Sequence, residues 1–450
     1  MALFSSPKFP TPPQPTMRAL RKMTEDLVDG PHRLLESMGD TLRFPTGPGL
    51  KPFYVTRDLG HIEDVCVRKR DSYQKGSILQ WMKPVFGDSI LVSEGEHWRK
   101  NRRLMAPAFV RRALQNYGEI MVRKTEEALE RIEPGVPFSV NHWSMVLTLD
   151  IVLECLFGAE LGDKAPLVEE ALNEGMEFAD NVVGRLIPEP LWMPSRAQRM
   201  RRSALAKLHP LVDAIIAERI QSGVEREDLL GLLLAARDED GSRLPPEEVR
   251  DEVVTLLLAG HETTALNIAY LFMVLGWRED IQQALVDELD EVLGAEAPSV
   301  ATLPKLTQNE AAWKESLRLY PPAAVFSRQA KEDTTMGEWN IPKGANVLIP
   351  VRSVHRDARW YPDPTSFQLE RWTPEEEAKR PRLAFLPFGA GNRVCIGDQF
   401  AKMEARLITA RVLQRFRMKT LIQGDPRFKL TITMRALDKI MVVFEARAPR

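Results

Sequence analysis

The residues best suited to chemistry lie in one loop near the C-terminal end, Phe388-Gly-Ala-Gly-Asn-Arg-Val-Cys-Ile-Gly397. Two glycines precede Cys395 and allow a tight turn in which backbone N–H groups can point at the sulfur. A helix is expected to begin at the end of this loop. Its positive end, together with Arg393, would favour a thiolate. A thiolate held in this way is a soft, electron-donating metal ligand, whereas the alternative for any single cysteine is a small buried hydrophobic residue.

A second unusual stretch, Ala259-Gly-His-Glu-Thr-Thr264, lies inside an otherwise apolar helical pattern. A glycine in a helix interior costs about 1 kcal/mol relative to alanine. The hydroxyl of Thr263 can bond back to the carbonyl of Ala259 and deform the helix, which would open a groove for a diatomic ligand and water. The alternative is a helix kink with a satisfied polar cluster. We expect His261 to be a polar helix residue rather than a ligand.

The loop spacing Phe-x-x-Gly-x-Arg-x-Cys-x-Gly resembles the haem-binding loop of the cytochrome P450 superfamily, and the helical stretch resembles its oxygen-activation motif. The resemblance extends from about residue 50 to the end of the chain. It implies that Cys395 is the axial thiolate of a haem b iron (iron protoporphyrin IX), a ligand that favours O–O cleavage. It also implies that Thr263 hydrogen-bonds the dioxygen and that Glu262 helps to relay protons from solvent.

Two further motifs resemble motifs of the same family and come in the same order along the chain. Glu315-Ser-Leu-Arg318 places an acid and an arginine on one helix face. The resemblance implies that this pair meets Arg371 in a buried structural triad, although Leu369 stands where the family usually has proline. The segment Trp98-x-x-x-Arg102 resembles the family's helix in which an indole N–H and a guanidinium bind one haem propionate. The fork of N–H donors on arginine fits the two oxygens of a carboxylate.

The remaining implied contacts are assigned by position in the family. Further propionate contacts would come from Arg328, His355 and Arg393, each of which is otherwise a surface charge. The expected substrate pocket contains no charged residue and consists of Ile78, Leu79, Met82, Phe86, Ala259, Ala323, Ala324, Val325, Phe326 and Met434. We therefore expect an apolar, lipid-like or terpenoid substrate, with fatty acids included. The residues of these motifs resemble those of the fatty-acid and microsomal-type branches of the superfamily more than those of its shortest soluble bacterial members.

A locally basic segment runs from Arg99 to Arg112 in a chain that is otherwise neutral. We interpret this segment either as a solvated helix face or, from the resemblance to the family, as a docking face for an acidic electron donor. No flavin or iron–sulfur domain is attached. The resemblance therefore implies a separate ferredoxin or flavodoxin-type donor with its NAD(P)H-dependent reductase.

Helical patterns dominate the elements that must position these residues. We expect a long helix over 245–275, further helices over 96–131, 139–160, 279–294 and 308–319, and strands at 53–55, 339–349 and 428–445. Two more helices are expected within 167–222, joined by a loop in which Leu186, Ile187, Leu191, Trp192 and Met193 alternate with prolines. That loop either packs on the core or covers an apolar pocket as a lid.

The expected fold is the mainly α cytochrome P450 architecture, a large helical body with a small β-rich lobe. A proline-rich lead-in and N-terminal helix would occupy residues 1–50. A single haem domain would fill 51–450.

The composition excludes several classes of protein. The 450 residues carry 61 Lys and Arg against 63 Asp and Glu, a net charge of −2 that argues against a general nucleic-acid binder. Three cysteines are too few for a disulfide scaffold, and their wide spacing offers no zinc-binding pair. We assign Cys66 and Cys155 to the core. No run of about 18 apolar residues predicts a transmembrane anchor, and no signal peptide is seen at the start.

The sequence therefore predicts a cytoplasmic monooxygenase that uses O2 and inserts one oxygen atom into a C–H or C=C bond. Bacterial cytosol is the simplest location, and a chain from which an anchor has been removed is the competing explanation. A haem-thiolate peroxygenase or isomerase would often lack the Glu262–Thr263 pair. The sequence is also compatible with a haem-based gas sensor or with a helical protein that binds no haem.

Overall fold

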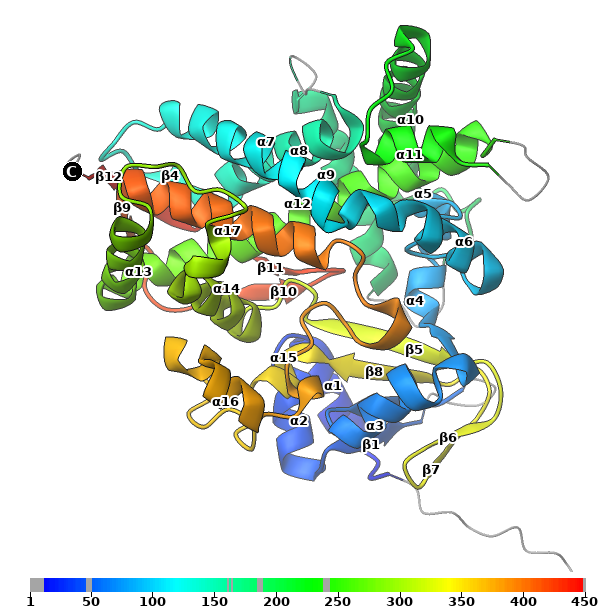
Figure 1. The fold of residues 1–450 in the computed structure, drawn as a ribbon. Helices are drawn as coiled ribbons and strands as arrows, with labels where there is room; N and C mark the ends of the chain where they lie inside the picture. The colour runs from blue at the N-terminus through cyan, green and yellow to red at the C-terminus, as the bar shows by residue number, and fades with distance from the viewer. Residues whose placement is uncertain are drawn as a thin grey trace, which may run out of the picture. The chain divides into compact units, whose positions relative to one another are not determined.

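The computed structural model describes residues 12–45, 51–159, 162, 165–183, 189–237 and 243–447 (Figure 1). They form two compact units. Unit 1 comprises the described residues up to Gln80 together with Arg318–Phe367 and Pro374–Cys395. Unit 2 comprises Trp81–Leu317, Gln368–Thr373 and the described residues from Ile396 onward. Helices predominate in the described chain and the sheets are small, so the predicted mainly α fold is confirmed.

Unit 1 is built around a five-stranded sheet with the order β1-β2-β8-β5-β3. These strands are β1 (Thr41–Phe44), β2 (Phe53–Thr56), β8 (Asn346–Pro350), β5 (Val325–Ala330) and β3 (Tyr73–Lys75). β2 and β8 are parallel and the other neighbours antiparallel. β1 lies before residue 50 and β2 after it, and the two strands pair. The end of the N-terminal segment therefore belongs to this sheet. β6 (Thr334–Met336) and β7 (Trp339–Ile341) form a separate hairpin.

The helices of unit 1 are short. They are α1 (Met17–Glu25), α2 (Gly30–Met38), α3 (Leu59–Glu63), α4 (Ser77–Gln80), α15 (Val351–His355) and α16 (Pro374–Lys379). One π-helical turn, η1 (Asp64–Arg68), and the 3-10 turns η2 (Arg70–Ser72), η7 (Arg382–Ala384) and η8 (Gly391–Arg393) complete the unit. The N-terminal helix expected within residues 1–50 is therefore two helices, α1 and α2. Residues 1–11 of the lead-in and residues 46–50 lie outside the described residues.

Unit 2 contains the long helices together with two short ones, α5 and α11. They are α5 (Lys83–Phe86), α6 (Gly95–Met105), α7 (Arg111–Glu130), α8 (Val140–Phe157), α9 (Ala165–Val183), α10 (Arg196–Ser222), α11 (Leu229–Ala235), α12 (Pro246–Trp277), α13 (Glu279–Val292), most of α14 (Thr307–Leu319) and α17 (Asp398–Arg415). Its 3-10 turns are η3 (Ala106–Phe109), η5 (Leu303–Lys305) and η6 (Leu369–Trp372). The single helix expected over 96–131 is thus divided, because Pro107 falls in η3 between α6 and α7.

Two small sheets complete unit 2. β4 (Phe138–Ser139), β12 (Met441–Ala446) and β9 (Phe416–Thr420) form one sheet. β10 (Phe428–Leu430) and β11 (Met434–Ala436) form an antiparallel hairpin. In that hairpin Lys429 lies directly opposite Arg435.

Helix α12 passes through the interior of unit 2, as its apolar sequence predicts. It begins with Pro246 in the first turn, followed by Glu247 and Glu248, which favour a helix start. It packs against α8, α10, α17 and β9, and most of its side chains are buried. Helix α8 is long and apolar enough to cross a membrane, but 61% of it is buried inside the fold and it packs most extensively on α12. We therefore interpret α8 as a core helix.

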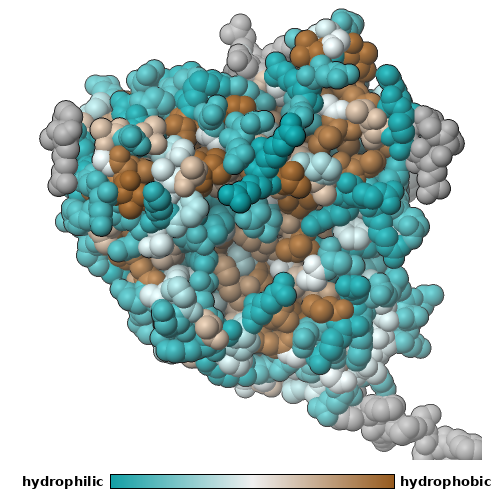
Figure 2. All heavy atoms as spheres, in the orientation of Figure 1, coloured by the Kyte–Doolittle hydropathy of each residue, from teal (hydrophilic) through white to brown (hydrophobic). Residues whose placement is uncertain are grey.

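In the described part of the loop between α9 and α10, Met193 is half-buried, whereas the two residues before it are exposed. Leu191 is 50% exposed and Trp192 is 80% exposed, so the core-packing interpretation is wrong for these two residues. Leu186, Ile187 and Pro188 lie outside the described residues. The face of the molecule in Figure 2 is mostly hydrophilic with smaller hydrophobic areas, as expected for an ordinary globular composition.

Candidate functional site

The loop before Cys395 is a tight turn that requires glycine. Gly389 has φ +77° and Gly391 has φ +75°, a region that side chains with a Cβ rarely adopt. A Cβ at Gly391 would lie 1.8 Å from the backbone oxygen of Cys66, so the chain passes η1 at a distance that only glycine allows. The amide of Cys395 donates to the carbonyl of Phe388 (3.0 Å) and closes the turn.

Among the three cysteines, Cys395 alone is exposed. Along the chain it stands three residues before the first residue of α17, as the predicted helix start requires. Burial raises the pKa of the Cys66 thiol, and it raises the pKa of the Cys155 thiol well above its usual value. Both therefore remain thiols at neutral pH and are poor metal ligands. The donor chemistry of Cys395 suits a soft metal centre such as a haem iron.

The polar stretch of α12 has the predicted back-bonding. The hydroxyl of Thr263 donates to the carbonyl of Ala259 (3.0 Å), and that of Thr264 contacts the carbonyl of Gly260 at 3.5 Å. However, α12 is one continuous α-helix from Pro246 to Trp277, so the predicted local deformation is not present. The back-bond satisfies the hydroxyl without breaking the helical ladder.

His261 is a polar residue of α12, as predicted, and it lies in the core. Its ring is buried, and Nδ1 donates to the carbonyl of Leu257 in the preceding turn. Its own carbonyl accepts a hydrogen bond from Thr148 on α8 (2.9 Å). Burial lowers the pKa of the His261 imidazole, so the ring is neutral, and it is the backbone carbonyl of His261 that links α12 to α8.

Glu262 is nearly inaccessible to solvent, and its carboxylate is held by two residues near the C-terminal end of the chain. Glu262 is 1% exposed, and its Oε1 accepts from the hydroxyl of Thr433 (2.7 Å) and from Nε of Arg435 on β11 (2.5 Å). Sequence reasoning missed Arg435, because no spacing rule links residues 173 positions apart. The acid expected to relay protons is thus buried and paired with a half-buried arginine.

The two groups expected to hold carboxylates in unit 2, the indole N–H of Trp98 and the guanidinium of Arg102, lie on one helix. Trp98 and Arg102 are four residues apart on α6 and share one face, with Trp98 buried and Arg102 half-buried.

The three expected in unit 1 have different surroundings. Arg328 on β5 is buried and its guanidinium lies 5.0 Å from the Phe326 ring centroid. Arg393 is half-buried in η8, two residues before Cys395. His355 is fully buried, and its Nε2 accepts the backbone N–H of Leu386 (2.9 Å). This hydrogen bond supports the backbone turn at Leu386 and makes Nδ1 the ring atom that carries the proton, so the expected propionate contact of His355 stays a prediction.

The expected triad residues are all buried. Glu315 pairs with Arg371 (3.3 Å) and accepts from Nε1 of Trp372 (2.9 Å). The turn η6 carries Arg371 even though Leu369 replaces the usual proline. Within unit 1, the guanidinium of Arg318 donates to the carbonyls of His355, Pro364 and Ser366 at 2.7–3.0 Å. These contacts are structural.

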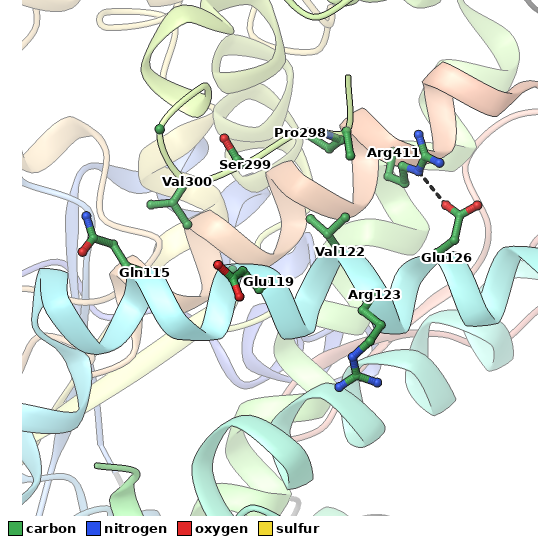
Figure 3. Close-up of a pocket in the computed structure, with 12 residues that line it drawn as sticks. Gln115, Glu119, Val122, Arg123, Glu126, Pro298, Ser299, Val300 and Arg411 are labelled. Atoms are coloured by element: carbon green, nitrogen blue, oxygen red, sulfur yellow. Dashed lines mark hydrogen bonds and ion pairs between the residues drawn. The ribbon is translucent and has the colours of Figure 1, made fainter. Parts of the chain in front are cut away.

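The ten expected substrate-pocket residues fall into two groups by burial. Met82, Phe86, Ala324 and Met434 are buried, and Ile78, Leu79, Ala259, Ala323, Val325 and Phe326 are half-buried. None of them lines the groove of about 670 Å³ shown in Figure 3. That groove lies between α7, residues 297–301 and α17, and the ion pair of Arg411 with Glu126 (2.6 Å) spans one part of it.

Glu404 on α17 is a buried acid whose effect on stability depends on pH. Burial raises the pKa of Glu404 well above 4.5, and the neighbouring Thr264 hydroxyl offsets this only in part. The folded state therefore holds a proton that the unfolded state has released. The free energy of unfolding falls as the pH rises from about 4.5 toward the folded-state pKa. Glu404→Gln should remove this loss, so its Tm relative to the parent protein should increase with pH between about 5 and 8.

The matched control is Glu310 on α14. Burial acts to raise its pKa, but Lys402 and Arg406 lower it overall, so its stabilisation is present at neutral pH and is lost in acid. Glu310→Gln should therefore lower Tm at about pH 7 and have less effect at about pH 4. A Tm difference for Glu404→Gln that does not change with pH would contradict the assignment.

Comparison with known proteins agrees with this geometry. The family model described as Cytochrome P450 matches residues 7–441. The chain is 34% identical to cyclooctatin synthase of Streptomyces melanosporofaciens, over 88% of each protein. It is 30% identical to pentalenene oxygenase of Streptomyces avermitilis, over 92% of each. It is also 30% identical to cytochrome P450 4V2 of Homo sapiens, over 78% of this chain and 72% of that protein.

The chain therefore belongs to the cytochrome P450 family. As a member it is a haem-thiolate monooxygenase that uses O2, an organic substrate and electrons from a redox partner.

Proposed function

We propose that this monooxygenase oxidises an apolar terpenoid-like substrate, with haem b held by Cys395. The observation that carries the proposal is the loop of Cys395, where two left-handed glycines lead to an exposed thiol just before a helix. The substrate class is supported by the uncharged set of expected pocket residues. Relatives named pentalenene oxygenase and cyclooctat-9-en-7-ol 5-monooxygenase point the same way.

Each polar residue has one part in the proposal. Cys395 would hold the iron through its thiolate, and the propionates would be held by Trp98, Arg102, Arg328, His355 and Arg393. When bound, a haem with a thiolate ligand supplies the activation of O2 that inserts one oxygen atom into a C–H bond. The hydroxyl of Thr263 donates a hydrogen bond to the carbonyl of Ala259 and can rotate to donate to oxygen instead. Glu262, the preceding residue, would relay protons from solvent to this position.

Electrons would come from a ferredoxin or flavodoxin-type donor with its reductase. The exposed cations Arg99, Arg103, Arg111 and Arg112 support an acidic partner, although Glu96 and Glu227 neutralise two of them. We place the protein in the cytoplasm. The Streptomyces relatives and the buried position of α8 support that location.

The proposal is tested by reconstitution. The purified holoprotein should give product from a panel of cyclic terpenes when NADPH, a ferredoxin and its reductase are supplied. Binding of a substrate should also shift the haem spectrum. Product formed with hydrogen peroxide but not with the reductase system would favour a peroxygenase. A haem spectrum that no terpene or fatty acid shifts would contradict the proposed substrate class.

Thr263→Ala should separate electron use from product formation. Without the hydroxyl, protons are no longer delivered in order, so NADPH consumption should continue while product per NADPH falls by about tenfold or more. Thr263→Ser keeps a hydroxyl on the same carbon and should retain most of the coupling. Unchanged coupling in Thr263→Ala would mean that this hydroxyl takes no part in oxygen activation.

A further inference from the structure

Two consecutive acids near the start of α12 bind backbone amides of the segment formed by residues 82–93. The Oδ2 atom of Asp251 accepts the N–H of Asp88 (3.0 Å), and Oε1 of Glu252 accepts the N–H of Ile90 (2.8 Å). All of these residues lie in unit 2, and α5, the helix of this segment, packs against α12. The segment is therefore held on α12 at two amides that are two residues apart.

Other amides of the segment bond within it. The N–H of Phe86 donates to the carbonyl of Met82 (3.2 Å), and the N–H of Ser89 donates to the carbonyl of Phe86 (3.3 Å). Met82 and Phe86, two of the expected pocket residues, are thus parts of one hydrogen-bonded turn. Bonds inside the turn fix its shape, whereas the two acids of α12 fix its position.

Asp251 also lies against the turn that follows α5. Gly87, which ends α5, has φ +57°, a left-handed value that residues with a Cβ rarely adopt. A Cβ at Gly87 would overlap the carboxylate of Asp251, so this acid fills the space that a side chain would take. The contact places the carboxylate directly beside the Asp88 amide that it binds.

Glu252 joins the same segment to α6. Its Oε1 atom also accepts from the side-chain amide of Asn101 (2.6 Å), and both residues are buried. Asn101 lies on the helix that carries Trp98 and Arg102, which are proposed to hold a haem propionate. Because a buried carboxylate is costly unless it is hydrogen-bonded, these bonds stabilise one arrangement of the segment, α6 and α12.

We propose that Asp251 and Glu252 are positioning residues that set substrate specificity, because they fix the pocket wall formed by Met82 and Phe86 relative to α12. They act through backbone amides of the segment rather than through contact with the substrate. The wall side chains are apolar and buried, so the substrates that depend on their position are bulky and apolar. This inference rests on the proposed apolar pocket and adds the residues that hold one of its walls.

The first experiment measures amide hydrogen exchange in the substrate-free holoprotein. Asp251→Ala removes the acceptor of the Asp88 amide, so exchange in residues 82–93 should become about tenfold faster, while exchange in α13 should not change. Asp251→Asn keeps an acceptor oxygen and should restore much of the protection. Equal exchange of this segment in the parent protein and in Asp251→Ala would overturn the proposal.

Glu252 should have its own signature, because it joins the segment to α6. Glu252→Met removes the shared acceptor and should increase exchange in α6 as well as in residues 82–93. Glu252→Gln keeps an acceptor oxygen and should retain the protection of both. If Glu252→Met leaves the exchange of α6 and of the segment unchanged, the role of Glu252 is wrong.

The second experiment examines the pocket wall without a known substrate. Imidazole and phenylimidazole both bind haem iron through a ring nitrogen, and the phenyl group adds contact with the pocket. In Asp251→Ala the preference for phenylimidazole over imidazole, measured by spectral titration, should fall about tenfold, because the wall is no longer held in one position. An unchanged or increased preference would overturn the role in specificity.

Turnover separates positioning from a general loss of folding. Asp251→Ala should raise the KM of an accepted terpene about tenfold and spread oxidation over more carbon atoms, with kcat within about twofold of the parent value. Asp251→Asn should restore the KM. The matched control is Glu247→Gln, which removes an exposed charge one turn earlier on α12 and should leave every readout unchanged. A fall in kcat with an unchanged KM would contradict the assignment.

Failure of this inference is distinguishable from failure of the proposed function. If no terpene or fatty acid shifts the haem spectrum of the parent protein, but Asp251→Ala alters exchange and ligand preference, the substrate class is wrong and the positioning role stands. If the parent protein oxidises terpenes and Asp251→Ala changes neither exchange, ligand preference nor KM, the positioning role is wrong and the proposed function stands.

Discussion

Cys395→Ala is expected to abolish the red-shifted Soret band of the reduced, carbon-monoxide-treated protein. The band reports a thiolate bound to haem iron. Of the three cysteines only Cys395 is exposed and placed in the glycine turn that precedes α17. The variant should bind haem weakly or without the thiolate signature and should form no product. The measurement is the reduced carbon-monoxide difference spectrum of protein purified with added haem.

Cys155→Ala is the matched control, because it removes a sulfur whose thiol is kept protonated by burial in α8. It should retain the band and lose only a modest amount of stability, about 1 kcal/mol for a small core truncation. A normal band in Cys395→Ala, or its loss in Cys155→Ala, would contradict the ligand assignment.

Glu315→Ala should be the most destabilising of these substitutions. The fully buried Glu315 carboxylate accepts from the amide of Gln368 (3.0 Å) and from Trp372, and it pairs with Arg371. Removing it leaves the buried guanidinium of Arg371 without this carboxylate. We expect the free energy of unfolding to fall by about 3–5 kcal/mol. Urea unfolding of the holoprotein measures the change.

A surface ion pair provides the comparison for Glu315. Arg427 and Asp438 are 2.8 Å apart, but the side chain of Arg427 is 78% exposed. Asp438→Ala should therefore cost much less stability than Glu315→Ala, because solvent screens the exposed pair. Similar losses for Asp438→Ala and Glu315→Ala would show that the Glu315 cluster contributes no more than a surface pair.

The parts of this protein that sequence could predict are local. The helix of Pro246–Trp277 follows from a proline start and a long apolar run, and the back-bond of Thr263 follows from a four-residue helical spacing. The turn before Cys395 follows from glycine spacing, since only glycine readily takes the observed φ values. In each case the residues that decide the geometry are neighbours in the chain.

The parts that sequence could not predict depend on distant pairing. Nothing near Glu262 indicates Arg435, and nothing near Gly391 indicates the backbone oxygen of Cys66 that it must pass. The partner of Glu262 is set by which strand of a hairpin reaches α12. The bond between Nε2 of His355 and the backbone amide of Leu386 is another contact between distant residues that no local pattern indicates.

The contact of Tyr270 with β11 has a consequence for protein engineering. An isolated two-stranded hairpin is only marginally stable, and a slip of one residue would turn Arg435 to the opposite face. Tyr270 fixes the register by binding the backbone on both sides of that arginine. Loop changes between Leu430 and Met434 should therefore preserve the pairing of these two residues and keep Thr433, because the strand register and the Thr433 hydroxyl both set the surroundings of Glu262.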